Sequence, residues 1–208
     1  MKTGTRRALI HVDILIDFIS GTLPVPKGEE VVELANKLTR DALRRKDPVI
    51  FLADCHDINN STHFKKWPMH CPRGGAGQKF HPLLLVPDGA FVVYKGTGLD
   101  DDGYSGFDKK NVEIYIVGHA KLLPLNFSAL EELLDSLDVG RDDIDGLATD
   151  YCDKATAIDS VKLGYETRLV VDACRAVNLK PGDEALALNE MLNAGVIMTT
   201  TDEVLHET

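Results

Sequence analysis

Short apolar runs rich in β-branched residues alternate along this chain with longer amphipathic segments, and this alternation constrains the fold more than any other feature. The strand candidates are ALIHVD (8–13), VIFLAD (49–54), FVVYK (91–95), IDGLA (144–148), RLVVD (168–172) and VIMTT (196–200). Helical periodicity occurs at about 28–46, 127–138, 151–164 and 183–194. Because near-continuous apolar strands are buried on both faces, the pattern predicts an α/β fold: a doubly wound, mostly parallel sheet of about six strands with helices on both faces.

The length of 208 residues fits a single domain spanning 1–208. Two segments fit the alternation poorly. Residues 55–90 are polar and rich in Gly and Pro, and loops of this length are usually functional. Residues 111–126 (NVEIYIVGHAKLLPLN) contain a strand-like run, so 108–126 is a candidate inserted strand, hairpin or small lobe.

The formal net charge of -10 argues against nucleic acid and anionic membrane as partners, since an acidic surface repels both. No apolar run approaches the ~20 residues of a membrane span. The basic start MKTGTRR precedes an apolar run, but that run carries Asp13 and Asp17, so we expect a buried strand of the mature fold and no signal peptide.

Four cysteines are present, at positions 55, 71, 152 and 174. The even count would also allow two disulfides. In a chain of this length without a signal peptide we expect reduced thiols and a cytoplasmic location.

Polar side chains stand at corresponding places on four of the predicted strands. Asp13, Asp54 and Lys95 each end a strand, and Cys152 follows the next one where a helix begins. Ligands of open α/β sheets bind outside the carboxyl ends of the strands, so these four side chains should converge in one crevice. Each has an ordinary alternative: an aspartate can be a helix cap, a lysine can be solvated, and a thiol can be inert and packed in the core. The crevice would carry no site only if all of these alternatives were true at once.

The surroundings of Cys152 favour a nucleophile. Thr149 or Asp150 is a natural helix N-cap, which would place Cys152 in the first turn. There the helix dipole favours a thiolate, and free N–H groups can hold an oxyanion. Neighbouring aspartates oppose the thiolate, and Lys95 would offset them. Asp13 is the candidate base, giving a Cys–Asp–Lys set.

The segment DCHDINNSTHFKKWPMHC (54–71) is unusually rich in metal-ligand side chains. Asp54 and His56 are two residues apart on an extended segment and so point the same way. His63 and His70 lie further along. Mixed carboxylate and imidazole ligands suit Zn²⁺, Fe²⁺ or Mn²⁺. The alternative is a chance clustering of histidines in a loop.

These motifs together resemble the nicotinamidase/pyrazinamidase branch of the isochorismatase-like cysteine hydrolases over nearly the whole chain. ALIHVDILIDF is similar to the family's first strand, DCH…HF…WPMHC to its metal loop, YKG…YSGF to its lysine segment and GLATDYC…TAIDSVKLGY to its nucleophile segment. Within the metal loop, Trp-Pro-x-His-Cys is the specific part.

The resemblance implies a role for each matching residue. Cys152 would be the nucleophile, Asp13 the general base and acid, and Lys95 the cation that activates them. A cis peptide between Leu147 and Ala148 is implied, with the N–H groups of Ala148 and Cys152 as the oxyanion hole. The remaining implied residues are the metal ligands Asp54, His56, His70 and, as a fourth ligand found in only part of the family, His63, and the ring-packing residues Phe18, Trp67, Tyr104 and Leu147.

The implied reaction is hydrolysis of nicotinamide, or of pyrazinamide-like amides, through a thioester, assisted by one divalent metal, with Zn²⁺ expected before Fe²⁺ or Mn²⁺. The implied partner is a small aromatic amide, and a homo-oligomer is compatible with the family. The alternatives are a related amidase or ureido hydrolase, and a non-catalytic ligand or metal binder. The chain departs from the family at Leu15, which stands in place of Gln, and in the longer, more acidic GTGLDDDG before YSGF.

Overall fold

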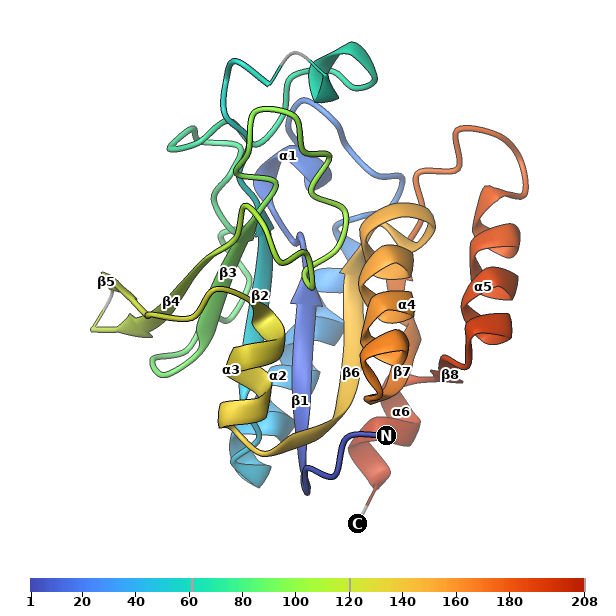
Figure 1. Cartoon of the computed structure of the whole chain (residues 1–208). Coiled ribbons are helices and arrows are strands. Elements are labelled where there is room, and N and C mark those ends of the chain that lie inside the picture. Colours follow the sequence, from blue (N-terminus) through green and yellow to red (C-terminus); the bar gives the residue numbers. More distant parts are fainter. Residues whose placement is uncertain (61, 120, 208) are drawn as a thin grey trace.

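A computed structural model describes residues 1–60, 62–119 and 121–207. Its centre is a single eight-stranded sheet with the spatial order β5-β4-β3-β2-β1-β6-β7-β8 (Figure 1). The strands are β1 (Arg6–Val12), β2 (Val49–Asp54), β3 (Phe91–Lys95), β4 (Glu113–Gly118), β5 (Lys121–Pro124), β6 (Val139–Leu147), β7 (Glu166–Arg175) and β8 (Ile197–Thr199).

The predicted fold class is confirmed, and the predicted count of about six strands is corrected to eight. The six predicted strands are all parallel to one another. The two additional strands, β4 and β5, pair antiparallel at one edge and come from the segment that the sequence left undecided. Strand β5 is exposed along its whole length, so its sequence carries no buried face from which a strand could be predicted.

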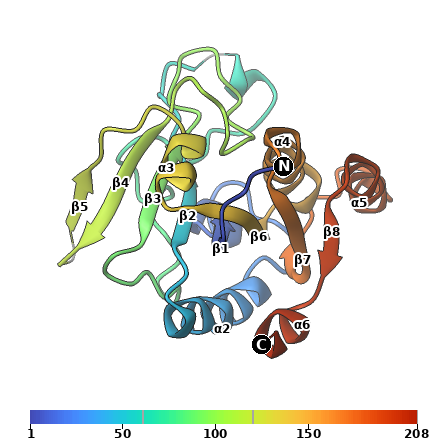
Figure 2. The same ribbon diagram turned by 60° about the horizontal axis from the view of Figure 1, so that its bottom comes forward.

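Helices cover both faces of the sheet. They are α1 (Ile16–Ile19), α2 (Glu30–Arg45), α3 (Leu130–Ser136), α4 (Lys154–Leu163), α5 (Asp183–Ala194) and α6 (Thr201–His206). Helices α2 and α6 lie on one face, α3 and α4 on the other, and α5 packs beside α4 (Figures 1 and 2). The short α1 is a correction, because the first apolar run was expected to continue as a strand where the chain in fact turns at Asp13.

Alternate residues of the central strands pack into two apolar cores, one on each face of the sheet. Leu9 and Phe51 pack with the inner face of α2, including Leu38. Ile10 and Leu52 point to the opposite face, where they pack in the cluster that contains helix α3. Because β2 is buried at all six of its positions, its residues on both faces are apolar until Asp54.

All four cysteines are buried free thiols, as expected from the sequence. No helix within the described ranges combines the length and apolar character that a membrane crossing needs.

The strands that carry the candidate residues end at one edge of the sheet. Strands β1, β2, β3 and β6 run parallel, so their carboxyl ends lie together, and the long loops cover this edge at the top of Figure 1. The loop after β2 is tied down by short pairings of His56 with Pro72 and of Leu15 with Phe80. The sheet therefore supplies a rigid base on which the loops can assemble a site.

Candidate active site

The strand register brings the first two polar side chains together. Asp54 and Lys95 are direct partners at the ends of β2 and β3. Asp13 follows β1 with φ of 51°, and its backbone N–H donates to the carbonyl of Leu52 at 3.1 Å. The Asp13 Oδ1 in turn accepts from the Asp54 N–H at 2.9 Å. Adjacent parallel strands thus place the two carboxylates side by side.

Lys95 is the centre of the polar cluster. Its Nζ lies 2.7 Å from Asp13 Oδ2, forms an ion pair with Asp54 Oδ1 and lies 3.4 Å from Cys152 Sγ. It also donates to the Gly103 carbonyl at 2.8 Å. All of these side chains are buried. A buried ammonium is stable only beside opposite charges. The Asp13 and Asp54 carboxylates supply these charges to Lys95 within the cluster.

Burial and charge set the protonation of the acid and the thiol. Burial, together with the negative charge of Asp54, raises the pKa of Asp13 to about 6, against the opposing effect of Lys95. Burial also raises the pKa of the Cys152 thiol well above its usual value; Lys95 opposes this, and the Asp13 and Asp54 carboxylates add to it. These effects favour a thiol beside the Asp13 carboxylate and oppose the thiolate that the predicted helix-dipole effect would favour.

The chain enters the helix after β6 differently from the prediction. Residues Thr149–Asp153 form a single π turn ahead of α4, and no side chain caps it. Asp150 was a predicted N-cap, but its carboxylate accepts from the N–H groups of Val177 and Asn178 at 2.9 and 2.8 Å. Thr149 Oγ1, the other candidate cap, is buried without a hydrogen-bond partner. Asp150 thus joins the π turn that contains Cys152 to the loop after β7, and these two hydrogen bonds fix the position of the turn.

The peptide bond between Leu147 and Ala148 is cis, the conformation implied by the resemblance. Both residues line the same pocket as Cys152. The backbone between β6 and the π turn is therefore part of the pocket wall.

Three histidines each commit one ring nitrogen to a fixed acceptor. The Nδ1 atoms of His56, His63 and His70 lie 3.2 Å from the Gly96 carbonyl, 3.0 Å from Asp102 Oδ1 and 2.7 Å from the Pro68 carbonyl, respectively. A carbonyl or carboxylate oxygen can only accept, so each Nδ1 carries the proton and each Nε2 of a neutral ring presents a lone pair.

The Nε2 atoms and one carboxylate oxygen face a common point. His63 Nε2 lies 3.3 Å from His70 Nε2, and Asp54 Oδ2 lies 3.5 Å from His56 Nε2 and 3.7 Å from His70 Nε2. His56 Nε2 is buried without a hydrogen-bond partner, and the three rings offer nitrogens within 4.8 Å of one another. Burial and the neighbouring His56 lower the pKa of His63 to about 4, which keeps it neutral. Lone pairs that face each other beside a carboxylate fit a divalent transition metal.

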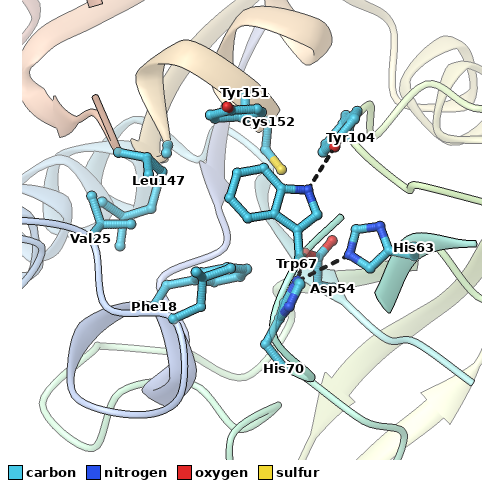
Figure 3. A pocket seen from close by; sticks show the side chains of 13 residues that line it. Phe18, Val25, Asp54, His63, Trp67, His70, Tyr104, Leu147, Tyr151 and Cys152 are labelled. Atoms are coloured by element: carbon cyan, nitrogen blue, oxygen red, sulfur yellow. Dashed lines mark hydrogen bonds and ion pairs between the residues drawn. The ribbon is translucent and has the colours of Figure 1, made fainter. Parts of the chain in front are cut away.

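An apolar pocket joins the thiol to the histidine cluster (Figure 3). Phe18, Trp67, Tyr104 and Leu147, predicted from the sequence, all line it. The Trp67 Nε1–H donates to the Tyr104 hydroxyl at 2.9 Å, and the Phe18 and His70 ring centroids lie 5.3 Å apart. The pocket therefore has flat aromatic walls, with the Cys152 sulfur and the side chains of His63 and His70 opening into it.

Sequence reasoning missed several residues of this site. Val25 and Tyr151 line the pocket, and the Tyr151 ring meets Trp67 edge-on at 4.9 Å between centroids. Asp102 holds His63, and Asp17 accepts from the Cys71 N–H at 2.7 Å, next to His70. Tyr151 and Asp17 lie inside the recognised motifs, so those motifs could have suggested them, whereas Val25 sits in a loop without any pattern.

Comparison with known proteins by family model, by sequence and by structure points to one family. A family model described as the isochorismatase domain matches residues 7–121 and 126–203. The nicotinamidase of Escherichia coli (strain K12) is 33% identical over 213 residues, covering 93% of this chain and 94% of that protein. The pyrazinamidase of Pyrococcus horikoshii in complex with zinc superposes with a TM-score of 0.79 at 31% identity, covering 94% of this chain and 99% of that one.

A third similar structure is that of PnC1 from L. infantum in complex with nicotinate, with a TM-score of 0.74 at 26% identity, covering 95% of this chain and 94% of that one. The match to the family model spans both strands and helices on either side of the pocket and includes every residue of the polar cluster. The chain belongs to the isochorismatase family.

Proposed function

We propose that this protein is an amidohydrolase that converts nicotinamide to nicotinate and ammonia through a thioester on Cys152. One observation carries the proposal: the Cys152 sulfur lies 3.4 Å from Lys95 Nζ, within a buried acid–lysine cluster, and shares an aromatic-walled pocket with the histidine cluster. The named activities of the similar proteins support the same reaction.

In the first half of the reaction, the Asp13 carboxylate accepts the proton of the Cys152 thiol as the sulfur attacks the carboxamide carbon. The carbonyl oxygen becomes an oxyanion, for which the backbone N–H groups of Ala148 and Cys152 are the proposed donors. Collapse of this tetrahedral species breaks the C–N bond. Asp13 gives its proton to the departing nitrogen, which leaves as ammonia, and the acyl group remains on sulfur.

In the second half, Asp13 is again a carboxylate and takes a proton from water as that water attacks the thioester carbon. The C–S bond breaks and the sulfur recovers a proton from Asp13. The carboxylic acid formed loses its proton to solvent, where ammonia takes it up as ammonium, and the product leaves as nicotinate. Lys95 stays an ammonium throughout, since burial opposes its charge but Asp13 and Asp54 raise its pKa well above the usual value. Its role is to stabilise the negative charge that moves between Asp13 and the sulfur.

Asp54, His56, His63 and His70 are the proposed ligands of one metal ion, for which Zn²⁺ is our first assignment because one carboxylate and three imidazoles are common zinc ligands. Bound there, the metal would supply a Lewis acid that holds the pyridine nitrogen and so orients the carboxamide toward Cys152. The protein's own part is to fix the tautomers of the three rings and to keep the cluster away from bulk water.

The aromatic walls set the substrate class. Phe18 and Trp67 offer flat apolar surface to a six-membered ring, and Leu147 lines the same pocket as the nucleophile. A small planar amide such as nicotinamide or pyrazinamide suits this aromatic lining, in which His63 and His70 are the only basic side chains among the described residues. The four free thiols fit a reducing compartment such as the cytoplasm.

The test is ammonia release from nicotinamide by the purified protein, beside Cys152→Ala and the matched control Cys174→Ala. Cys174 is also buried, but its thiol donates to the Val170 carbonyl and Cys174 does not line the pocket. We expect release by the parent and by Cys174→Ala and none by Cys152→Ala. Release that survives Cys152→Ala would overturn the nucleophile, and no release by the parent would direct the search to other small amides.

A further inference from the structure

We propose that Asp102 is the positioning residue that makes His63 a metal ligand, and that the acidic loop, defined as residues 96–104, thereby sets the affinity of the metal site. The inference rests on the metal site of the proposed function and adds to it a residue that the recognised motifs do not contain. Asp102 lies in the stretch where this chain is more acidic than the family pattern.

The first step is the contact between the two side chains. Asp102 Oδ1 lies 3.0 Å from His63 Nδ1, and its other oxygen accepts from Lys66 Nζ at 2.6 Å. A carboxylate has no proton to give at neutral pH, so the His63 proton resides on Nδ1. The Nε2 lone pair of His63 is then directed at the point that the Nε2 of His70 also faces. The two Nε2 atoms lie 3.3 Å apart. Without Asp102 the ring would be free to exchange tautomers and to rotate.

The acidic loop also holds the backbone of His63. The His63 N–H donates to Asn60 Oδ1 at 3.0 Å. The Nδ2 of the buried Asn60 donates in turn to the carbonyls of Gly98 and Asp101 at 3.1 and 2.8 Å. The ring and the backbone of His63 are thus both fixed, directly or through Asn60, by the same loop.

His63 differs in this respect from the other two histidines. His56 and His70 are held by backbone carbonyls, those of Gly96 and Pro68, which no side-chain substitution removes. His63 is held by a side chain about forty positions away in the sequence, so its ligation depends on one replaceable carboxylate. A single substitution at Asp102 should therefore weaken one ligand and leave the rest of the cluster intact.

The loop is well supported, so Asp102 is presented from a defined backbone. The Gly103 carbonyl, next in sequence, accepts from Lys95 Nζ at 2.8 Å, and the Tyr104 hydroxyl accepts from Trp67. A Cβ on Gly103 would lie 2.4 Å from the Gly96 Cα, so the two ends of the loop are in direct backbone contact.

The experiment measures the dissociation constant for Zn²⁺ by competition with a chromophoric chelator, using full-length protein in which Cys152→Ala prevents turnover. Asp102→Ala should bind Zn²⁺ about 10–100-fold more weakly, the usual effect of removing such a supporting partner. Asp102→Asn should lose less, because its amide oxygen still accepts from Nδ1. Asp100→Ala is the matched control: this exposed aspartate of the same loop accepts from Thr62 Oγ1 and, among the described residues, forms no hydrogen bond or ion pair with a histidine.

A double-mutant comparison separates positioning from general damage. In a His63→Ala background, Asp102→Ala should cause no further loss of Zn²⁺ affinity, because the ligand through which it acts is gone. An equal loss with and without His63 would overturn the proposal, as would unchanged affinity in both Asp102 variants or a loss in Asp100→Ala as large as in Asp102→Ala.

The outcome also distinguishes this inference from the function on which it rests. Should Asp102→Ala fail to fold, the Asp102→Asn variant carries the same comparison. A parent protein that binds Zn²⁺ tightly together with an Asp102→Ala variant that binds it equally well would overturn only the role of Asp102. A parent that binds no Zn²⁺ would overturn the proposed metal site as well.

Discussion

The carboxylate of Asp13 lies 2.7 Å from the ammonium of Lys95, and neither side chain is exposed to solvent. The pair is completed by Asp54 on one side and by the Cys152 sulfur on the other. Two carboxylates and one ammonium in a shared low-dielectric space leave each charge dependent on the others. This relationship links the stability of the fold to the chemistry of the site.

Replacing Lys95 by Met should therefore lower both the stability of the fold and the activity. It leaves Asp13 and Asp54 as neighbouring buried carboxylates without their cation, which should lower the free energy of unfolding by about 3–5 kcal/mol and abolish ammonia release. Urea unfolding and an activity assay on the same sample test both. As a control, Lys154→Ala removes a lysine that pairs with the exposed Glu190 and should cost no more than about 1 kcal/mol. A Lys95→Met protein as stable as its parent would contradict the charge balance described.

The pKa of Asp13, raised to about 6 by burial and by Asp54, predicts an acidic limb in the pH–rate profile. The carboxylate is the active form, so kcat/KM should fall as pH drops through about 6, approaching tenfold per pH unit below it. The observed value belongs to the coupled set of Asp13, Lys95 and Cys152. A profile that stays flat from about pH 7 down to about pH 5 would argue against Asp13 as the base.

The raised pKa of Asp13 also makes the free energy of unfolding depend on pH. The folded-state pKa of Asp13 lies above the value near 3.9 of an unfolded aspartate, so the folded protein binds this proton more tightly. The contribution of Asp13 to the free energy of unfolding is then fully present below about pH 4 and is lost as pH rises through about 6. Asp13→Asn removes this dependence, and unfolding curves of the two proteins at several pH values between those limits measure it.

Removing the metal should impair turnover of nicotinamide without modifying Cys152. Dialysis against a chelator, with metal content measured, should lower both activity and the melting temperature, because the ion binds only the folded protein. Added Zn²⁺ should restore both. Benzamide, which lacks the ring nitrogen, should be a poor substrate whose turnover is insensitive to the chelator. Full nicotinamide turnover at negligible metal content would contradict the orienting role.

Gly77 lies against the carboxylate that positions the metal loop. A Cβ there would come within 1.9 Å of Asp17 Oδ2, the atom that accepts from the Cys71 N–H. Gly77→Ala should therefore displace Asp17, cost about 1–3 kcal/mol and weaken Zn²⁺ binding through His70. The matched control is Gly74→Ala in the same loop, where a Cβ has open space but φ is +75°. It should cost about 1–2 kcal/mol for the backbone alone and leave Zn²⁺ affinity unchanged. Equal losses of affinity in the two variants would contradict the role of Asp17.

The strand ends are the part of the site that sequence reasoning could place. Asp54 and Lys95 each close a buried apolar run, and in a parallel sheet such ends meet at one edge, which is where the structure has them. The approach of Lys95 Nζ to the Cys152 sulfur, at 3.4 Å, followed from the same argument. The roles assigned to these residues came from the family motifs and stay predictions until the variants are measured.

Other features had no local signal. The exposed strand β5 shows no alternation of buried and exposed positions. The sequence therefore leaves the segment that holds β4 and β5 open between an inserted strand, a hairpin and a small lobe, and the predicted count of about six strands does not include it. Asp150 has the sequence of an N-cap but instead holds the Val177 and Asn178 N–H groups, a partnership set by where β7 ends in space. The contact between Asp102 and His63 likewise joins two loops whose approach depends on the whole fold. Such tertiary partnerships override local propensity and are visible only in the structure.

The most direct test of the central claim is capture of the covalent intermediate. The protein would be mixed with excess nicotinamide, quenched in acid within one turnover and digested, and the peptide containing Cys152 would be examined by mass spectrometry. The account predicts a nicotinoyl thioester on Cys152 that appears and decays with turnover, with the peptides of Cys55, Cys71 and Cys174 unmodified. Ammonia release without any acyl group on Cys152 under these conditions, or acylation of another residue, would contradict it.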